Sequence, residues 1–523
     1  MRFAASRLIR RAAPAVTAVV AALAFAACTS TPPAGHAAGA TPGGSTVKAA
    51  VPAGPPPATL AQYDSQKLRW TPCNHGFQCA RMWVPFDYSR PGWRRFSLPV
   101  IKLPASVPSR RIGSLVVNPG GPGGSGVQYA LQARSQVSPA VRARFDVVGF
   151  DPRGVGASSP ALTCLSGPQL DKYFATYDQP TTPAQLATVV SQSKLFAQAC
   201  EQHSGAMLPY IGTANAARDM DVLRAVLGDR KLTYLGKSYG TYLGGWYAQL
   251  FPTHVRALVL DGAVNPAESG MTMNVIQAEG FQVALRSFTA SCLAQSGCPL
   301  GRGSVSAGIS RLEDLLKRAT SRPLASSIRG QPANAAMILN GVAASLYSKS
   351  YWPYLRSGLT AAFNGDGTLL VELGDLLLER SPSGHYSNLS AVDTAVNCVD
   401  RPWPRSLSVW QSLASAAEKA APQFGAPIMW GSLPCAYWPV RASPVPTFRA
   451  SGAPPILVVG TTRDPATPFR DAKALAGQLS SGVLLAWNGD GHTAYREGSS
   501  CVDSAVDRYL ISLQPPANGT LCG

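Results

Sequence analysis

Short apolar runs recur along this chain from residue 98 onward, and each is bounded by Gly, Pro, Asn or Asp. Such runs are typical of strands that are buried on both faces of a sheet. They predict strands at Ser114–Val117, Phe145–Phe150, Leu232–Leu235, Ala257–Leu260, Ile456–Val459 and Val483–Trp487. Helical periodicity falls between some of them, as at Met220, Leu223 and Leu227. The alternation predicts an α/β fold with a mostly parallel sheet flanked by helices.

The strand signals fade between about residues 265 and 450. Amphipathic helical patterns replace them at Ser304–Ala319, Ala335–Tyr347 and Asp366–Glu379. A large helical block inserted between two core strands would cover the carboxyl edge of the sheet, where open α/β sheets bind ligands. We therefore predict a core in two parts, residues 61–264 and 451–523, and a helical cap at 265–450.

The N-terminus has the features of an export signal over residues 1–27, with a basic start and a short apolar stretch from Ala15 to Ala27. Phe25-Ala-Ala-Cys28 is similar to a bacterial lipobox, in which the cysteine becomes lipidated, although Phe25 stands where Leu is usual. The alternative is ordinary cleavage at an Ala-x-Ala site, which would leave a secreted protein. Residues 28–60 are rich in Ala, Gly and Pro and would form a tether. We predict an exported protein, with the membrane reached only through Cys28.

The chain has eleven cysteines, so ten remain if Cys28 carries lipid. An even set in an exported chain predicts a disulfide framework, and we expect neighbours in the sequence to pair. The candidates are Cys73, Cys79, Cys164, Cys200, Cys292, Cys298, Cys398, Cys435, Cys501 and Cys522. The spacing around His75 is wrong for a structural zinc site, and no metal or other cofactor is predicted.

The formal net charge of +18 raises the question of a nucleic-acid partner. The basic residues are scattered, and the tight clusters beyond the N-terminus are Arg94-Arg95 and Arg110-Arg111. Nucleic-acid modules gather such residues on one element beside exposed aromatic side chains, so we predict no nucleic-acid binding. An anionic envelope or membrane surface accounts for the charge equally well.

The sharpest motif is Gly236-Lys-Ser238-Tyr-Gly240, which follows a predicted strand and precedes the helical pattern of residues 241–251. A tight strand-to-helix turn lifts a serine hydroxyl clear of the backbone, and flanking glycines relieve the crowding. Because the motif has this context, we predict that Ser238 is a catalytic nucleophile.

A catalytic serine needs a base, and an acid that orients the base. His492 follows the last predicted strand, where the Ser–Asp–His order of the fold expects the base. Asp464 follows the preceding strand in a loop stiffened by two prolines, and Asp261 is its competitor. Asp490 is too close to His492 in sequence to be preferred. We favour Asp464.

The developing oxyanion needs backbone N–H donors. Asn118-Pro-Gly-Gly121-Pro-Gly-Gly124 follows a strand and would supply one donor at Gly121 or close by. The amide of Tyr239 would supply the other. The alternative is a glycine-rich turn without a ligand; a phosphate loop is disfavoured, because no Gly-Lys-Ser/Thr ending follows.

With these motifs, the chain resembles the exported tripeptidyl aminopeptidases related to proline iminopeptidase, within the α/β-hydrolase superfamily. The resemblance covers roughly residues 65–523 and rests on 118–126, 149–156, 236–242 and the loops of Asp464 and His492. It implies a Ser238–His492–Asp464 triad, peptide substrates, and release of short peptides, such as tripeptides, from free N-termini. It also implies that acidic cap residues bind the substrate amine. Asp400 matches a family signature and Glu279 is a looser candidate; a cap salt bridge or a solvated carboxylate would explain either one equally well.

The predicted function is therefore that of an exported serine exopeptidase. A carboxylesterase or lipase on the same scaffold would share every triad residue, and a free amino group in the substrate would distinguish the two. A third alternative is a non-catalytic envelope-binding lipoprotein. Epoxide hydrolases and dehalogenases use a carboxylate nucleophile, so a serine at position 238 excludes them.

Overall fold

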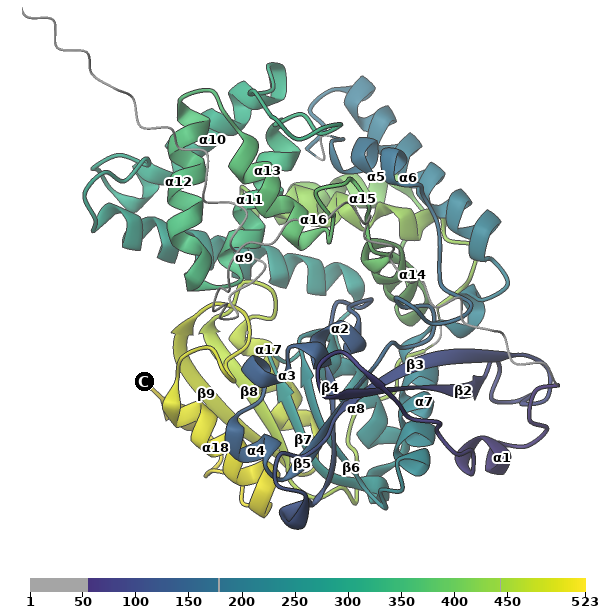
Figure 1. Ribbon diagram of the computed structural model, residues 1–523. Helices are drawn as coiled ribbons and strands as arrows, with labels where there is room; N and C mark the ends of the chain where they lie inside the picture. Colours follow the sequence, from purple (N-terminus) through teal and green to yellow (C-terminus); the bar gives the residue numbers. More distant parts are fainter. Residues whose placement is uncertain (1–54, 177–178, 443) are drawn as a thin grey trace, which may run out of the picture. The chain divides into compact units, whose positions relative to one another are not determined.

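The computed structural model describes residues 55–176, 179–442 and 444–523 (Figure 1). The predicted export signal, most of the tether and Cys28 lie outside the described residues. No helix in the described ranges combines the length and the apolar character that a membrane span requires.

A ten-stranded sheet forms the core, in the order β1-β2-β3-β5-β4-β6-β7-β8-β9-β10. Its six central strands pair in parallel. They are β4 (Gly113–Asn118), β5 (Phe145–Phe150), β6 (Leu232–Lys237), β7 (Val255–Asp261), β8 (Ile456–Arg463) and β9 (Gly482–Asp490). The predicted strands and the α/β class are confirmed, since each predicted run lies within one of these elements.

The strands at the two edges of the sheet were not expected from the sequence. An antiparallel group forms one edge, and β10 pairs in parallel with β9 at the other. These strands are β1 (Thr71–Cys73), β2 (Phe77–Pro85), β3 (Arg95–Leu103) and β10 (Thr520–Cys522). Along β2 and β3 buried and partly exposed residues largely alternate, which makes the apolar runs discontinuous.

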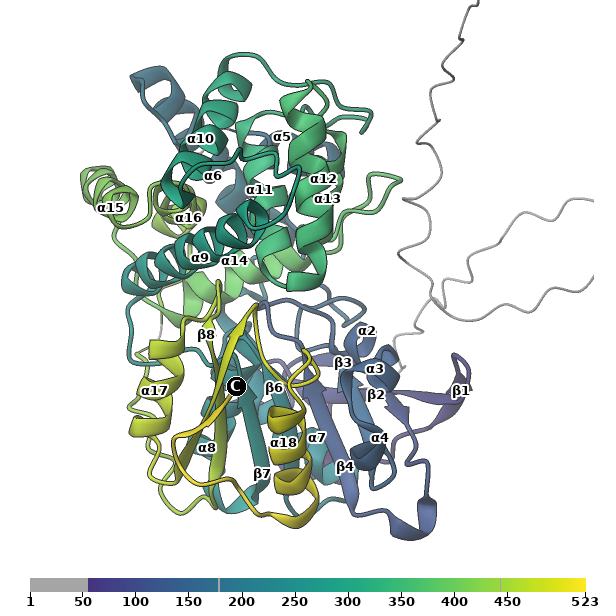
Figure 2. The same cartoon turned by 90° about the vertical axis from the view of Figure 1, so that its left-hand side faces the viewer.

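Helices cover both faces of the sheet (Figures 1 and 2). Tyr234 of β6 contributes to the apolar cluster on the α7 and α8 side, and the next residue, Leu235, contributes to the cluster on the α2 and α18 side. Both side chains are fully buried, which is why this strand appears as a continuous apolar run. The core helices are α1 (Leu60–Asp64), α2 (Gly126–Leu131), α3 (Ala133–Gln136), α4 (Pro139–Arg142), α7 (Thr213–Val226), α8 (Tyr239–Leu250), α17 (Phe469–Gln478) and α18 (Ser500–Ser512), with 3-10 turns η2 (Pro108–Arg110), η3 (Leu208–Tyr210) and η4 (Pro252–His254).

A helical cap lies between β7 and β8 in sequence and over one end of the sheet (Figure 2). It comprises α9 (Gly270–Leu293), α10 (Val305–Ser321), α11 (Ala335–Leu346), η5 (Lys349–Tyr351), α12 (Trp352–Phe363), α13 (Thr368–Leu377), α14 (Leu389–Asp400), α15 (Leu407–Ala420), α16 (Gly425–Gly431) and η6 (Leu433–Tyr437). These helices surround an apolar cluster of their own, which includes Leu285, Ile338 and Leu359.

Two helices from the segment assigned to the core join this cap. They are α5 (Gly167–Phe174) and α6 (Pro183–Ser204), which follow β5 and lie among the cap helices in Figure 1. Val189 of α6 packs in one buried cluster with Trp410 and Met429 of the cap. The cap is therefore built from two separate chain segments.

The described part of the chain contains five disulfides, and each joins neighbours in the cysteine order, as expected from the sequence. The pairs are Cys73–Cys79, Cys164–Cys200, Cys292–Cys298, Cys398–Cys435 and Cys501–Cys522.

Candidate active site

Ser238 lies between the last residue of β6 and the first turn of α8. Its φ of 56° and ψ of −128° place it in a region that non-glycine residues rarely occupy, as a sharp strand-to-helix turn requires. A Cβ at Gly236 would lie 2.4 Å from the carbonyl oxygen of Gly240, so the turn closes only with glycine there. The Ser238 amide donates to the Asp261 carbonyl at 2.9 Å, which ties the turn to the end of β7.

His492 and Asp464 meet at the ends of β9 and β8. The imidazole Nδ1 lies 2.8 Å from Oδ1 and 3.0 Å from Oδ2 of Asp464. The carboxylate is 1% exposed and accepts the backbone N–H groups of Ala466, Thr467 and Thr493. These donors fix the carboxylate, which in turn fixes the ring. The other ring nitrogen, Nε2, is buried and has no hydrogen-bond partner within the described part of the chain.

Thr467 is a neighbour of this pair that the sequence analysis missed. Its hydroxyl donates to Oδ2 of Asp464 at 3.1 Å, and its oxygen lies 3.3 Å from Nδ1 of His492. No motif marks it, because it is one of several small residues in the loop after β8. The one feature of the sequence that could have indicated it is its position three residues after Asp464, since short polar side chains often form hydrogen bonds within such turns.

Asp261, the competing acid, has a different environment. Its two carboxylate oxygens accept the amides of Ala494 and Tyr495, at 2.9 and 3.0 Å. Burial raises the pKa of Asp261 to about 6, against the opposing effect of the nearby Lys237 ammonium. Because its carbonyl also receives the Ser238 amide, Asp261 joins the serine turn to the chain that follows His492.

The glycine-rich loop after β4 packs directly against the serine turn. A Cβ at Gly120 would lie 2.6 Å from the Lys237 carbonyl oxygen, 2.8 Å from Cβ of Ser238 and 3.0 Å from the Tyr239 amide nitrogen. Gly121, the predicted donor, follows it with a φ of 112°. The loop that contains Gly121 therefore lies against the serine turn through Gly120, which precedes it.

The loop is held in place by the motif at residues 149–156. Asp151 accepts the Ser125 hydroxyl at 2.5 Å and the Val127 amide at 3.2 Å, at the start of α2. The fully buried Arg153 guanidinium binds Asp219 of α7 and the carbonyl of Tyr210. The motif at residues 149–156 therefore has a structural role, because it anchors the loop that lies against Ser238.

A cavity of about 430 Å³ lies among the cap helices, and it reaches the core at Gly121 of the loop after β4. Gly121 and Tyr347 form part of its wall, and the Tyr347 ring packs edge-on against His492 with 5.2 Å between centroids. Most of the wall is apolar, with a few polar groups that include Gln192, Asn340 and Asp393. A pocket of this size and character is typical of sites for small organic ligands.

The two predicted amine-binding residues lie outside this wall. Asp400 is buried and accepts the amide of Thr213 at 2.9 Å and its hydroxyl, and burial raises the pKa of Asp400 to about 6. Glu279 forms a surface salt bridge with Arg470 at 2.8 Å.

Asp393 is the only carboxylate among the described residues that line the cavity. Asn397 donates to it at 3.2 Å, and burial raises the pKa of Asp393 to about 7. Asp393 stands seven residues before Asp400 on the same helix, so spacing alone would place both on one face. The sequence does not show which end of the helix meets the cavity.

Among the described side chains, no cluster of three His, Cys, Asp or Glu residues could hold a metal ion.

Known proteins are similar to this chain over most of its length. Serine protease Hip1 of Mycobacterium tuberculosis (strain H37Rv) is 38% identical over 478 residues, covering 87% of this chain and 91% of the relative. Tripeptidyl aminopeptidase of Streptomyces lividans is 32% identical over 454 residues, covering 85% and 83%. Residues 421–522 match the family model described as TAP-like protein. The chain belongs to the tripeptidyl aminopeptidase family.

As a member of this family of α/β-hydrolases, the protein is a serine hydrolase. The relatives carry more than one activity name. Carboxylesterase B of M. tuberculosis (strain CDC 1551 / Oshkosh) is also 38% identical, over 454 residues that cover 85% of this chain and 86% of the relative. Family membership alone therefore leaves peptides and esters to be distinguished by the site.

Proposed function

We propose that this tripeptidyl aminopeptidase-family member is a serine exopeptidase that releases short peptides, such as tripeptides, from free N-termini. The observation that carries the proposal is the cap cavity that reaches Gly121 of the loop beside the serine turn, and whose described wall has Asp393 as its one carboxylate. A cavity of this size would limit the length of chain that binds, and a carboxylate in its wall would attract a substrate ammonium.

Ser238, His492 and Asp464 would act as the triad. His492 would take the hydroxyl proton through its unpartnered Nε2 as the Ser238 oxygen attacks the scissile carbonyl. The amides of Gly121 and Tyr239 would stabilise the oxyanion. His492 would then pass the proton to the leaving amine, the C–N bond would break, and an ester of Ser238 would remain. Water, deprotonated by His492, would hydrolyse that ester and restore the hydroxyl.

Asp393 is our candidate for the residue that binds the substrate amine. Its carboxylate faces the cavity, whereas both oxygens of Asp400 are bonded to Thr213. Gln192 supports the same role, because its side-chain carbonyl is buried and has no partner in the described structure. An ammonium in this cavity would give the buried Gln192 oxygen a donor and would pair with the Asp393 carboxylate.

The test compares a tripeptide p-nitroanilide that has a free N-terminus with its N-acetylated twin. We expect cleavage of the free-amine substrate alone, and loss of that cleavage in Ser238→Ala. Asp393→Asn should raise KM for the free-amine substrate about tenfold or more, since a charge-assisted contact is lost. Glu279→Gln is the matched control and should leave KM unchanged, because its carboxylate is paired with Arg470 on the surface. Equal cleavage of the two substrates would refute the exopeptidase proposal.

A carboxylesterase is the second candidate, favoured by the relative that bears that name. It would use the same triad and ignore the amino group. Hydrolysis of simple esters together with resistance of both anilides would support it.

We also propose that the chain is exported, either anchored through a lipid on Cys28 or secreted. The five disulfides support export, because such bonds persist in oxidising compartments. Mass spectrometry of the mature N-terminus would distinguish a lipidated Cys28 from a free end.

A further inference from the structure

We propose that Tyr347, at the C-terminal end of cap helix α11, is a positioning residue that holds His492 in its working orientation. The inference rests on the proposed function in one respect, namely that His492 acts as the base for Ser238. Three sets of contacts join the cap to the short segment from Asp490 to His492, and none of them involves Asp464.

The first set is between main chains. The amide of His492 donates to the carbonyl of Tyr347 at 2.7 Å, and Ser348 pairs with Gly491 in an antiparallel bridge. A Cβ at Gly491 would lie 3.0 Å from the Tyr347 carbonyl oxygen, and the φ of Gly491 is 114°. The close approach of the cap therefore depends on glycine immediately before the histidine.

The second contact is between rings. The planes of Tyr347 and His492 meet at 88°, with 5.2 Å between centroids. An edge-to-face pair of this kind restricts rotation of the imidazole about its side-chain bonds. The edge-to-face contact does not use the Tyr347 hydroxyl, so phenylalanine at this position should preserve the effect of the ring.

The third set is a group of polar contacts around Asp490. Arg463 of β8 binds both of its carboxylate oxygens, at 2.6 and 3.2 Å. From the cap, the Ser287 hydroxyl of α9 donates at 2.5 Å, and the Lys349 ammonium lies 3.6 Å away. Asp490 thus fixes the start of the histidine loop to the core and to two cap elements together.

The imidazole is therefore held from two sides. Asp464 binds its Nδ1, and the cap contacts both the main chain and the ring of His492. Misplacing a catalytic group by roughly 1 Å can cost about a hundredfold in rate. The cap would therefore act on the chemical step itself, beyond forming the wall of the substrate cavity.

The experiment uses the full-length protein and two reagents too small to need the cavity, p-nitrophenyl acetate and diisopropyl fluorophosphate. The first measures turnover and the second measures phosphorylation of Ser238. We compare Tyr347→Ala, Tyr347→Phe and Ser287→Ala with wild type, and thermal unfolding reports folding. Tyr347→Ala should slow both reactions about ten- to a hundredfold, while Tyr347→Phe stays close to wild type. Ser287→Ala, outside the cavity wall, should lower kcat several-fold at unchanged KM.

The proposal is overturned if Tyr347→Ala keeps wild-type rates with both small reagents and raises only KM for peptide anilides, since Tyr347 would then merely line the cavity. Should Tyr347→Ala fail to fold, Tyr347→Leu replaces it, and wild-type rates with both small reagents would refute the positioning role. A wild-type protein that reacts with both reagents but cleaves no peptide would refute the exopeptidase function, and the variants would still decide the role of Tyr347. A wild-type protein that reacts with neither would overturn both proposals.

Discussion

Two buried aspartates lie at the ends of neighbouring strands near His492, and their hydrogen bonds indicate different roles. Asp464 contacts the ring nitrogen, whereas Asp261 accepts amides from the chain beyond the histidine. The sequence could place both at the carboxyl edge of the sheet. It favoured Asp464, because two prolines stiffen that loop, and it could not show which of the two loops folds back toward the ring.

Replacing each aspartate by asparagine should separate these roles. Asp464→Asn should lower kcat by up to about 10⁴-fold, because the imidazole would be held in the wrong tautomer. It should also lower stability, because one of the two oxygens that accept three backbone amides is lost. Asp261→Asn keeps one oxygen and removes the acceptor of one amide, so we expect lower stability and a kcat within about tenfold of wild type. Steady-state kinetics and urea unfolding of both variants measure this. An equal loss of kcat in the two variants would contradict the assignment.

Gly120 offers a second test at this scale. A Cβ there would meet the serine turn at 2.6 to 3.0 Å, so Gly120→Ala should displace the loop of the proposed oxyanion donor. Loss of one such donor typically costs about 10²- to 10³-fold in kcat. The matched control is Gly452→Ala, whose φ of 90° is also positive but whose Cβ would meet nothing within 4 Å. If both variants lost kcat to a similar extent, the backbone strain of alanine at a positive φ would explain the loss, and displacement of the loop would not be needed.

At the scale of elements, the strands buried on both faces could be predicted because each one is a continuous apolar run. The antiparallel edge could not, since Met82 and Val84 alternate with partly exposed residues on β2. Helix α6 was assigned to the core from its position in the sequence, and its contacts with the cap through Val189 come from tertiary packing. Asp393 was missed for the same reason: a cavity wall is built from segments far apart in the chain.

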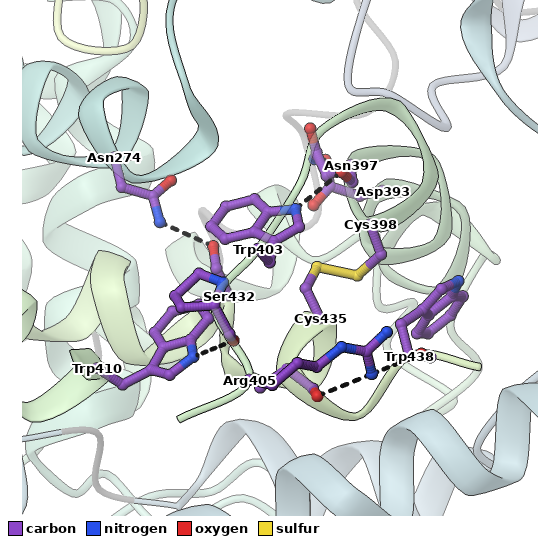
Figure 3. The surroundings of a disulfide bond; sticks show 12 residues. Asn274, Asp393, Asn397, Cys398, Trp403, Arg405, Trp410, Ser432, Cys435 and Trp438 are labelled. Carbon is purple, nitrogen blue, oxygen red and sulfur yellow. Dashed lines mark hydrogen bonds between the residues drawn. A yellow bond between two sulfur atoms is a disulfide. The ribbon is translucent and has the colours of Figure 1, made fainter. Parts of the chain in front are cut away.

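The disulfide Cys398–Cys435 joins α14, the helix of Asp393, to η6, amid several tryptophans (Figure 3). Trp403 donates to the carbonyl of Asn397 at 3.0 Å, on the same helix. Replacing both cysteines by alanine should reduce the free energy of unfolding by about 4 kcal/mol, because the bridge spans 37 residues. It should also raise KM for free-amine peptides, since Asp393 would lose its anchor.

The bridge between Cys73 and Cys79 provides the control for this prediction. It spans 6 residues between β1 and β2, at the sheet edge, so its removal should cost about 2 kcal/mol. KM should not change. Chemical denaturation under non-reducing conditions, combined with KM for the anilide, compares the two variants. A rise in KM in both would mean that general loosening, and not the position of α14, sets substrate binding.

For the whole molecule, buried carboxyl groups set the pH dependence of stability. Burial raises the pKa of Asp261 and Asp400 to about 6, of Asp393 to about 7 and of Asp471 to about 8. In the unfolded chain each would have a pKa of about 3.9. Between pH 4 and 8 the folded state therefore binds more protons than the unfolded state, and stability falls as pH rises through that window.

Asp471 should contribute most at the alkaline end of this range. It is 4% exposed, its Oδ1 has no partner among the described residues, and burial together with the nearby Glu268 carboxylate raises its pKa. Asp471→Asn keeps the shape and removes the charge, so Tm should increase at pH 9 relative to wild type and change little at pH 5. Calorimetry across pH 5 to 9 measures the slope of Tm, with Asp314→Asn, an exposed carboxylate on α10, as the control that should leave the slope unchanged. If Asp471→Asn destabilised the protein equally at every pH, the carboxylate would be needed for packing, and its ionisation would not be what limits stability at alkaline pH.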